Sequence, residues 1–187
     1  LSLTSTAVML VLRGLWGGPW LMDVKGLSRL DAGNILFVFT LAMIIGPFLI
    51  GLADSRLKRR RALIAGTHFG VGAGFLLMAA GGPGGIMSLL FAVRQMPTSY
   101  DVVLLIALGL LMSAPPLIYA MTRQAVAAEN TGKALSAINL AFFLGTAMMQ
   151  SATDPIAGRW GLSAVMLFMG GSVLVATLAF LWFTRAA

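Results

Sequence analysis

The chain has no cysteine, one histidine and only six acidic residues among its 187. The missing cysteines exclude disulfides and thiolate metal sites, although they say little about the cellular compartment. Charged residues make up 10% of the chain and hydrophobic residues 59%, and the mean hydropathy is +0.93. Because a soluble domain cannot wet its surface with so little charge, the composition indicates a membrane protein.

Six stretches are long and apolar enough to cross a bilayer, since a spanning helix needs about 20 mostly apolar residues. They cover residues 4–22, 33–53, 62–80, 102–122, 133–153 and 162–184. A transmembrane β-barrel would need strands that alternate apolar and polar residues, and runs such as "DVVLLIALGLLMSA" do not alternate. We therefore expect an all-α membrane protein with six transmembrane helices and no cleaved signal peptide.

The basic residues are concentrated in one place, because five of the thirteen lie in the hexapeptide "RLKRRR" at positions 56–61. By the positive-inside rule this loop is cytoplasmic, and alternation then places both chain ends in the cytoplasm. The net charge of +7 is thus explained by orientation in a plasma or inner membrane, with the lipid bilayer rather than nucleic acid as partner. Trp20 and Trp160 are expected at the outer interface and Trp182 at the inner one.

The segment 81–101 divides the chain into two sets of three expected helices, residues 1–80 and residues 102–187. Its apolar core, residues 86–93, is too short to span and predicts a periplasmic or outer connector with a short surface helix. The second set then enters the membrane from the face opposite to the first. This is the arrangement of an inverted-topology repeat.

Arg13 lies near the midpoint of the first window, where a charge costs at least about 2.5 to 3.5 kcal/mol on insertion scales. On an α-helix it shares a face with Trp16, Gly17 and Trp20. All six acidic residues lie at expected helix ends or in loops, so we expect none to neutralise Arg13, and none to be buried deeply enough to carry a coupling proton. The counter-charge is then a substrate anion, a carboxylate of another chain segment or backbone carbonyls, unless the side chain extends to the membrane surface.

A polar stripe runs along the fifth window, where side chains recur at intervals of three and four: Ser136, Asn139, Phe143, Thr146 and Gln150. Such a stripe faces protein or water rather than lipid, so it either forms hydrogen bonds between helices or lines a cavity. Tyr119 and Asn34 add single polar contacts. His68 is either a core histidine or a proton relay.

Glycines in the third window, Gly66, Gly70 and Gly74, share one face and allow another helix to approach closely. Pro115, Pro116 and the Gly46–Pro47 pair should bend their helices.

The sequence has no metal-ligand spacing, no phosphate-binding glycine loop and no nucleophile beside a base, so we expect neither an enzyme nor a bound cofactor or metal.

The loop "GLADSRLKRRRAL" resembles the signature between the second and third helices of each half in the major facilitator superfamily. That signature reads glycine, any residue, leucine, alanine, aspartate, arginine, any residue, glycine and two basic residues. Leu52, Ala53 and Asp54 match it, and Lys58 and Arg59 occupy the basic places. The departures resemble an eroded second copy of the signature: Ile50, Ser55 and Leu57. "RGLWGGPWL" and "GKALSAINLAFFLGTAMMQ" are similar to the seventh and eleventh helices of a twelve-helix member.

The resemblance implies the C-terminal six-helix half of a major facilitator transporter, built as two inverted three-helix repeats. In that family helices one, two, four and five of each half line a central cavity. The resemblance also implies a cytoplasmic latch of Asp54, Lys58, Arg59 and Arg123, in which Arg123 is an ion-pair partner of Asp54. The alternative for this loop is a solvated segment that only sets orientation.

The sequence thus predicts part of a secondary transporter that moves a small anionic solute by alternating access, with coupling, if any, in the other half. The expected substrate-binding residues are Arg13, Trp16, Trp20, Tyr119, Asn139, Phe143 and Gln150. An N-terminal six-helix half or a second copy would complete the cavity. The alternative is a non-transporting membrane scaffold or assembly protein that binds a partner through the glycine face of the third window.

Overall fold

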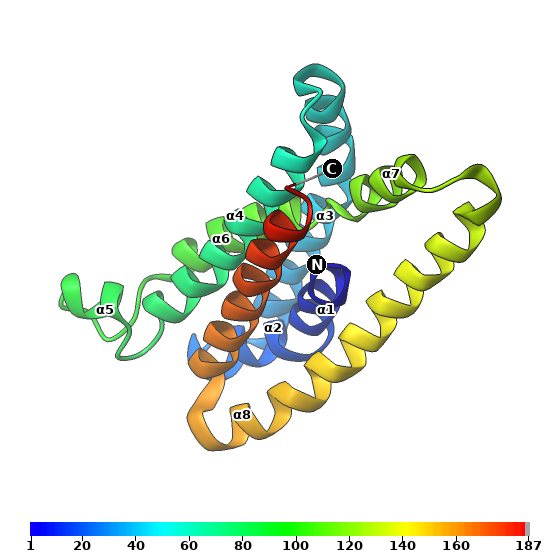
Figure 1. The fold of residues 1–187 in the computed structure, drawn as a ribbon. Helices are drawn as coiled ribbons and strands as arrows, with labels where there is room; N and C mark the ends of the chain where they lie inside the picture. The colour runs from blue at the N-terminus through cyan, green and yellow to red at the C-terminus, as the bar shows by residue number, and fades with distance from the viewer. Residues whose placement is uncertain (186–187) are drawn as a thin grey trace.

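The computed structural model describes residues 1–185, and within that range the chain forms helices joined by turns, with no strand (Figure 1). The α-helices are α1 (Ser2–Val11), α2 (Gly17–Pro19), α3 (Arg29–Leu57), α4 (Arg60–Gly81), α5 (Ile86–Leu90), α6 (Thr98–Leu111), α7 (Pro115–Ala125) and α8 (Thr131–Phe183). Two π-helical segments, η1 (Leu12–Trp16) and η2 (Trp20–Val24), and a 3-10 turn, η3 (Ala128–Asn130), complete the order. The all-α prediction is confirmed. Residues 186–187, which end the second expected set, lie outside the described residues.

Four helical stretches are long and apolar enough to cross a membrane: Arg29–Leu57, Arg60–Gly81, Thr98–Ala125 and Ala128–Phe183. The last contains a sharp break at Gly161, whose φ of 77° and ψ of 178° are angles that essentially only glycine adopts. We call residues 131–160 the long limb of α8 and residues 162–183 its short limb. They meet at the bottom of Figure 1, in orange. These lengths and compositions fit a membrane location.

The chain begins with an uninterrupted helical run of α1, η1, α2 and η2, which we call the leading helix (residues 2–24). In its π segments the Gly17 amide donates to the Leu12 carbonyl and the Lys25 amide to the Trp20 carbonyl. A π turn holds one residue more than an α turn, so it rotates the side chains that follow it. Side-chain faces inferred from α-helical spacing therefore do not hold beyond Leu12.

Three close helix pairs organise the molecule, and each has a glycine at its contact. The leading helix packs against the long limb where Gly145 meets the backbone of Leu3. Helix α3 packs against α6 at Gly109, and α4 packs against the short limb where Gly72 meets Leu174. A Cβ atom at any of these glycines would clash with the neighbouring helix, so the small residue permits the approach.

The predicted glycine face of α4 lies largely inside the chain. Gly70 and Gly74 contact Leu111 and Leu108 of α6, whereas a Cβ atom at Gly66 would meet open space. Two of the three glycines thus serve packing between helices of this chain.

Prolines lie inside α3 and at the start of α7. Pro47 lies inside α3, has no N–H and cannot bond the carbonyl of Met43 one turn earlier. The hydroxyl of Ser113, in the gap between α6 and α7 that precedes Pro115, lies 3.1 Å from this carbonyl and 2.9 Å from the carbonyl of Gly109, so the two acceptors share its hydrogen. A side chain from outside α3 therefore offers a donor to the group that the proline leaves open.

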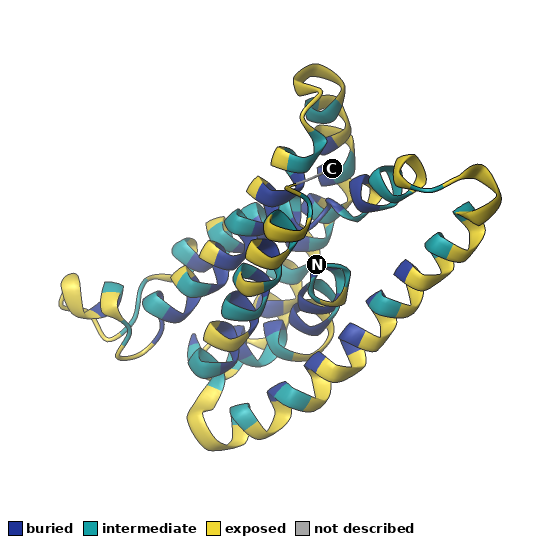
Figure 2. Ribbon diagram, viewed as in Figure 1, coloured by how far each residue is buried: buried dark blue, intermediate teal, exposed yellow. Residues whose placement is uncertain are grey.

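Burial is uneven among the helices (Figure 2). Within its most apolar window α4 is 56% buried, whereas α3 is only 22% buried. Large apolar side chains are exposed on α3 and on the long limb, among them Phe37, Leu41, Phe48, Leu140, Phe143 and Met148. The predicted surface helix of the connector is α5, between the end of α4 at Gly81 and the start of α6 at Thr98.

Candidate functional site

Arg13 lies in η1 with an exposed side chain. Within residues 1–185 the only ion pairs are Lys25 with Asp101 and Arg60 with Asp54. Within these residues no carboxylate forms an ion pair with Arg13. Its guanidinium also forms no hydrogen bond with another described residue.

The two tryptophans expected on the face of Arg13 lie in different surroundings. Trp16 is half-buried, and its indole Nε1 donates to Thr153 Oγ1 on the long limb at 2.9 Å. Trp20 is fully buried, and its Nε1 donates to Asp101 Oδ1 at 2.8 Å. The expected shared face does not form, because the π turns rotate the later side chains away from that of Arg13. Trp20 accordingly packs in the core and is not exposed on a helix face.

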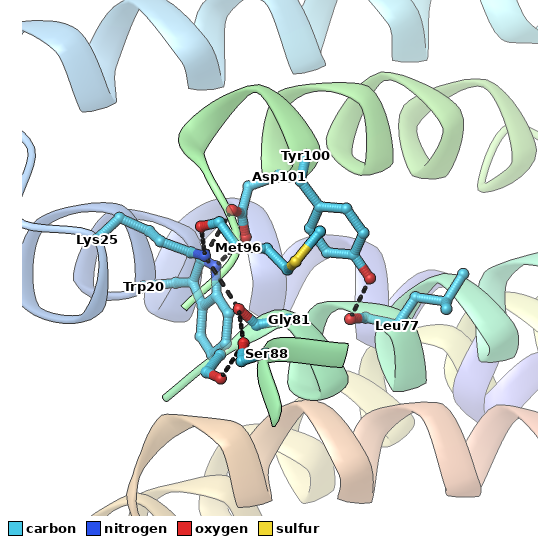
Figure 3. A network of polar contacts seen from close by, with 9 residues as sticks. Trp20, Lys25, Leu77, Gly81, Ser88, Met96, Tyr100 and Asp101 are labelled. Atoms are coloured by element: carbon cyan, nitrogen blue, oxygen red, sulfur yellow. Dashed lines mark hydrogen bonds and ion pairs between the residues drawn. The ribbon is translucent and has the colours of Figure 1, made fainter. Parts of the chain in front are cut away.

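Trp20 belongs to a buried polar network where four segments meet (Figure 3). Lys25 Nζ lies 2.8 Å from Asp101 Oδ2 and donates to the carbonyls of Met96 at 3.0 Å and Gly81 at 3.4 Å. The side chains of Lys25 and Asp101 are only 1% and 0% exposed. The network joins the end of the leading helix to the end of α4, the connector and the start of α6.

The expectation that no carboxylate is deeply buried is wrong for Asp101. In the sequence Asp101 borders an apolar window, and only packing against the leading helix removes it from solvent. The one signal was that Lys25 and Asp101 carry opposite charges and both lie on the expected outer side. Their pairing over such a sequence separation is a tertiary property that this signal does not specify.

The polar stripe of the fifth window lies on the long limb and is divided between two environments. Thr146 is buried and donates back to the carbonyl of Phe142. Asn139, Phe143 and Gln150 are exposed, and Tyr119 of α7 donates its hydroxyl to Asn139 Oδ1. One contact in this stripe is therefore a hydrogen bond between helices, while the remaining exposed side chains are available to line a cavity.

An open hollow of about 880 Å³ lies between the leading helix and the long limb. Trp16, Pro19, Asp23, Asp154 and Arg159 are among its lining residues. Of the expected binding residues only Trp16 reaches it. Arg13 is not among the lining residues.

The expected latch region contains an ion pair between Asp54 and Arg60. Arg60 Nη2 lies 2.6 Å from Asp54 Oδ2, and its Nη1 donates to Gln124 Oε1 at the end of α7 at 2.9 Å. Lys58, Arg59 and Arg123 are exposed and form no ion pair within residues 1–185. The sequence placed Asp54 in a charge network but did not identify Arg60 as its partner in this conformation, or Gln124 as a second acceptor for Arg60.

His68 is buried, and both ring nitrogens have partners. Nε2 lies 2.8 Å from Ser5 Oγ and Nδ1 lies 2.7 Å from the Ile64 carbonyl. The carbonyl can only accept, so Nδ1 carries the proton and the Ser5 hydroxyl donates to Nε2. This geometry favours a core histidine over a proton relay.

No protein-family model, curated protein or solved structure matches the chain.

Proposed function

We propose that the chain is one half of a secondary transporter of the major facilitator type, which moves a small anionic solute by alternating access. The observation that carries the proposal is Arg13, an exposed cation on an apolar helix with no acidic partner within residues 1–185. At membrane depth a guanidinium needs an anion or water. Its planar fork of donors suits a carboxylate or phosphate group.

The pairing of helices supports two inverted repeats. The chain has six helical runs when α6 with α7 counts as one run and each limb of α8 as one. The first run (the leading helix) pairs with the fifth (the long limb), the second (α3) with the fourth (α6 with α7), and the third (α4) with the sixth (the short limb). If runs one to three are exchanged with runs four to six, the first of these pairs becomes the second, and the third pair stays the same. A twofold relation between the sets predicts this pattern.

The exposed apolar faces support a second six-helix body. The α3 window is 22% buried and the α8 window 33% buried, and both helices expose large apolar side chains. Patches of this extent are normally covered by lipid or protein. An N-terminal half or a second copy would cover α3 and the long limb and enclose Arg13.

The inner charge network supports a latch that opens and closes with the cavity. Asp54 remains the latch acid and Arg60 is its partner in this conformation, while Arg60 also donates to Gln124. We assign a contact with the other half to Arg123, which is exposed at this end of the helices.

Ligand-dependent stability distinguishes the transporter from the scaffold. A ligand that binds only the folded state raises the unfolding temperature, so the complete protein in detergent should be stabilised by at least one member of a panel of small carboxylates and phosphates. The Arg13→Ala variant should lose that response, whereas Arg29→Ala, which changes an exposed arginine at the start of α3, should keep it. Stabilisation by a partner protein alone, with no response to any solute, would favour the scaffold.

A further inference from the structure

We propose that the turn between α3 and α4 binds an anionic phospholipid, with the headgroup phosphate in a basic hollow. The hollow has a volume of about 440 Å³ and is lined by Lys58, Arg59, Arg60, Arg61, Ala62 and Leu181. It lies at one end of helices that are long and apolar enough to cross a membrane, which is where the headgroups would lie if these helices span it. The proposal depends on membrane location and not on transport.

Three of the four cations in this hollow have no carboxylate partner within residues 1–185. Asp54 compensates the charge of Arg60. Lys58 and Arg59 are exposed and form no ion pair. The hollow therefore concentrates positive charge that the described chain does not neutralise, and such clusters beside a membrane helix attract anionic headgroups.

Arg61 is fixed in place without losing its charge. Its Nε donates to Thr184 Oγ1 at 2.8 Å and its Nη2 to the Leu181 carbonyl at 2.7 Å, both at the end of α8. The guanidinium is thus ordered before any ligand binds. The amides of the first turn of α4 add a partial positive charge at the same place, since a helix N-terminus favours a phosphate.

The apolar wall of the hollow distinguishes a lipid from free phosphate. Ala62 of α4 and Leu181 of α8 line it beside the cations. One turn further along each helix, Gly66 has open space around its Cα atom and Leu178 is 58% exposed. A phospholipid can place its headgroup phosphate among the arginines and its acyl chains over this apolar surface. Inorganic phosphate can contact only the basic side chains.

The test measures lipid binding to the complete protein in detergent by native mass spectrometry. Phosphatidylglycerol and phosphatidylcholine with identical acyl chains are compared. The wild type should retain phosphatidylglycerol preferentially. The double variant Lys58→Gln, Arg59→Gln should bind it about 30-fold more weakly, the change expected from removing two cations beside an anionic group. The matched control Arg29→Gln, Arg94→Gln removes two exposed basic residues outside the hollow and should leave the preference unchanged.

Equal retention of the two lipids by the wild type, or equal loss of preference in both double variants, would overturn the proposal. Displacement of phosphatidylglycerol by millimolar inorganic phosphate would show a phosphate site without lipid specificity and would also overturn it. If the double variant is not monodisperse, Lys58→Gln alone should give about one-fifth of wild-type affinity, in line with one cation removed. These outcomes do not depend on whether the protein transports a solute.

Discussion

Arg13 lies at the middle of the leading helix and Lys25 directly after its end, and the surroundings of these two cations differ completely. Lys25 is buried and satisfied by Asp101 and two backbone carbonyls. Arg13 is exposed and forms no ion pair with another described residue. A buried, fully bonded ion pair fixes a structure, whereas an uncompensated guanidinium needs an external partner. Lys25 is therefore structural and Arg13 is the candidate for solute binding.

Removing one partner of the outer ion pair should be costly. Lys25→Met leaves the Asp101 carboxylate buried without its cation and should lower the free energy of unfolding by about 3–5 kcal/mol. The additional change Asp101→Asn removes the charge and keeps an acceptor for Trp20, so the double variant should recover part of the loss. Unfolding in mixed micelles measures this cycle. If Lys25→Met cost no more than Lys133→Met at an exposed position, the network would have no structural role.

Ser113 should stabilise α3 from outside that helix. In Ser113→Ala the Met43 carbonyl, which Pro47 leaves without a helical partner, loses its donor. An unsatisfied buried acceptor costs about 1–3 kcal/mol in unfolding free energy. The control Ser172→Ala removes a hydroxyl that bonds only its own exposed helix at Phe168, and it should change stability by less than about 0.5 kcal/mol. Equal effects of the two substitutions would contradict this account.

At the scale of elements, Gly161 divides α8 into two limbs that run along different neighbours. Gly161→Ala forces an L side chain to a φ of 77° and should destabilise the fold by about 1–3 kcal/mol. Gly158 lies in the helix just before it with open space around it, so Gly158→Ala should be neutral or stabilising by up to about 1 kcal/mol. Thermal unfolding of both variants in the same detergent is the check, and a stabilising Gly161→Ala would show that the limbs need no break.

Most helix positions followed from the sequence because a bilayer imposes a length on its helices. The windows 33–53 and 62–80 lie inside α3 and α4, and the break at Gly161 separates the windows 133–153 and 162–184. The π segments were not predictable, since apolar length does not reveal whether a turn holds one extra residue. That one difference moved Trp20 from the expected binding face into the core.

Within the candidate site, the sequence predicted only those features that depend on composition and not on which helices become neighbours. Arg13 lacks a partner because the acidic residues are few and lie at the ends of apolar windows, which the sequence displays directly. The pairs Lys25–Asp101 and Tyr119–Asn139 depend on which helices become neighbours. Neighbours in the fold are set by packing at glycines such as Gly145 and Gly109, and no local pattern specifies them.

At the scale of the molecule, polar networks tie the helices together at two places. The Lys25–Asp101 network joins the leading helix to α4, α6 and the connector, and the Asp54–Arg60–Gln124 network joins the α3–α4 turn to α7. Between them the helices pack through glycines and apolar side chains, with single hydrogen bonds such as those of Trp16 with Thr153 and His68 with Ser5. This arrangement suits a body that moves as a unit against a second one, as alternating access requires.

The most direct test of the central claim is solute exchange in proteoliposomes that contain the complete protein, with a panel of small carboxylates and phosphates. The account predicts exchange of at least one anion and a reduction of about tenfold or more in Arg13→Ala, since bonds to a charged group contribute about 1.5–3 kcal/mol. Arg94→Ala, an exposed arginine of the connector, should exchange at the wild-type rate. Exchange of every transported solute at an unchanged rate in Arg13→Ala would contradict the assignment of Arg13, and no exchange of any solute by the wild type would contradict the transporter itself.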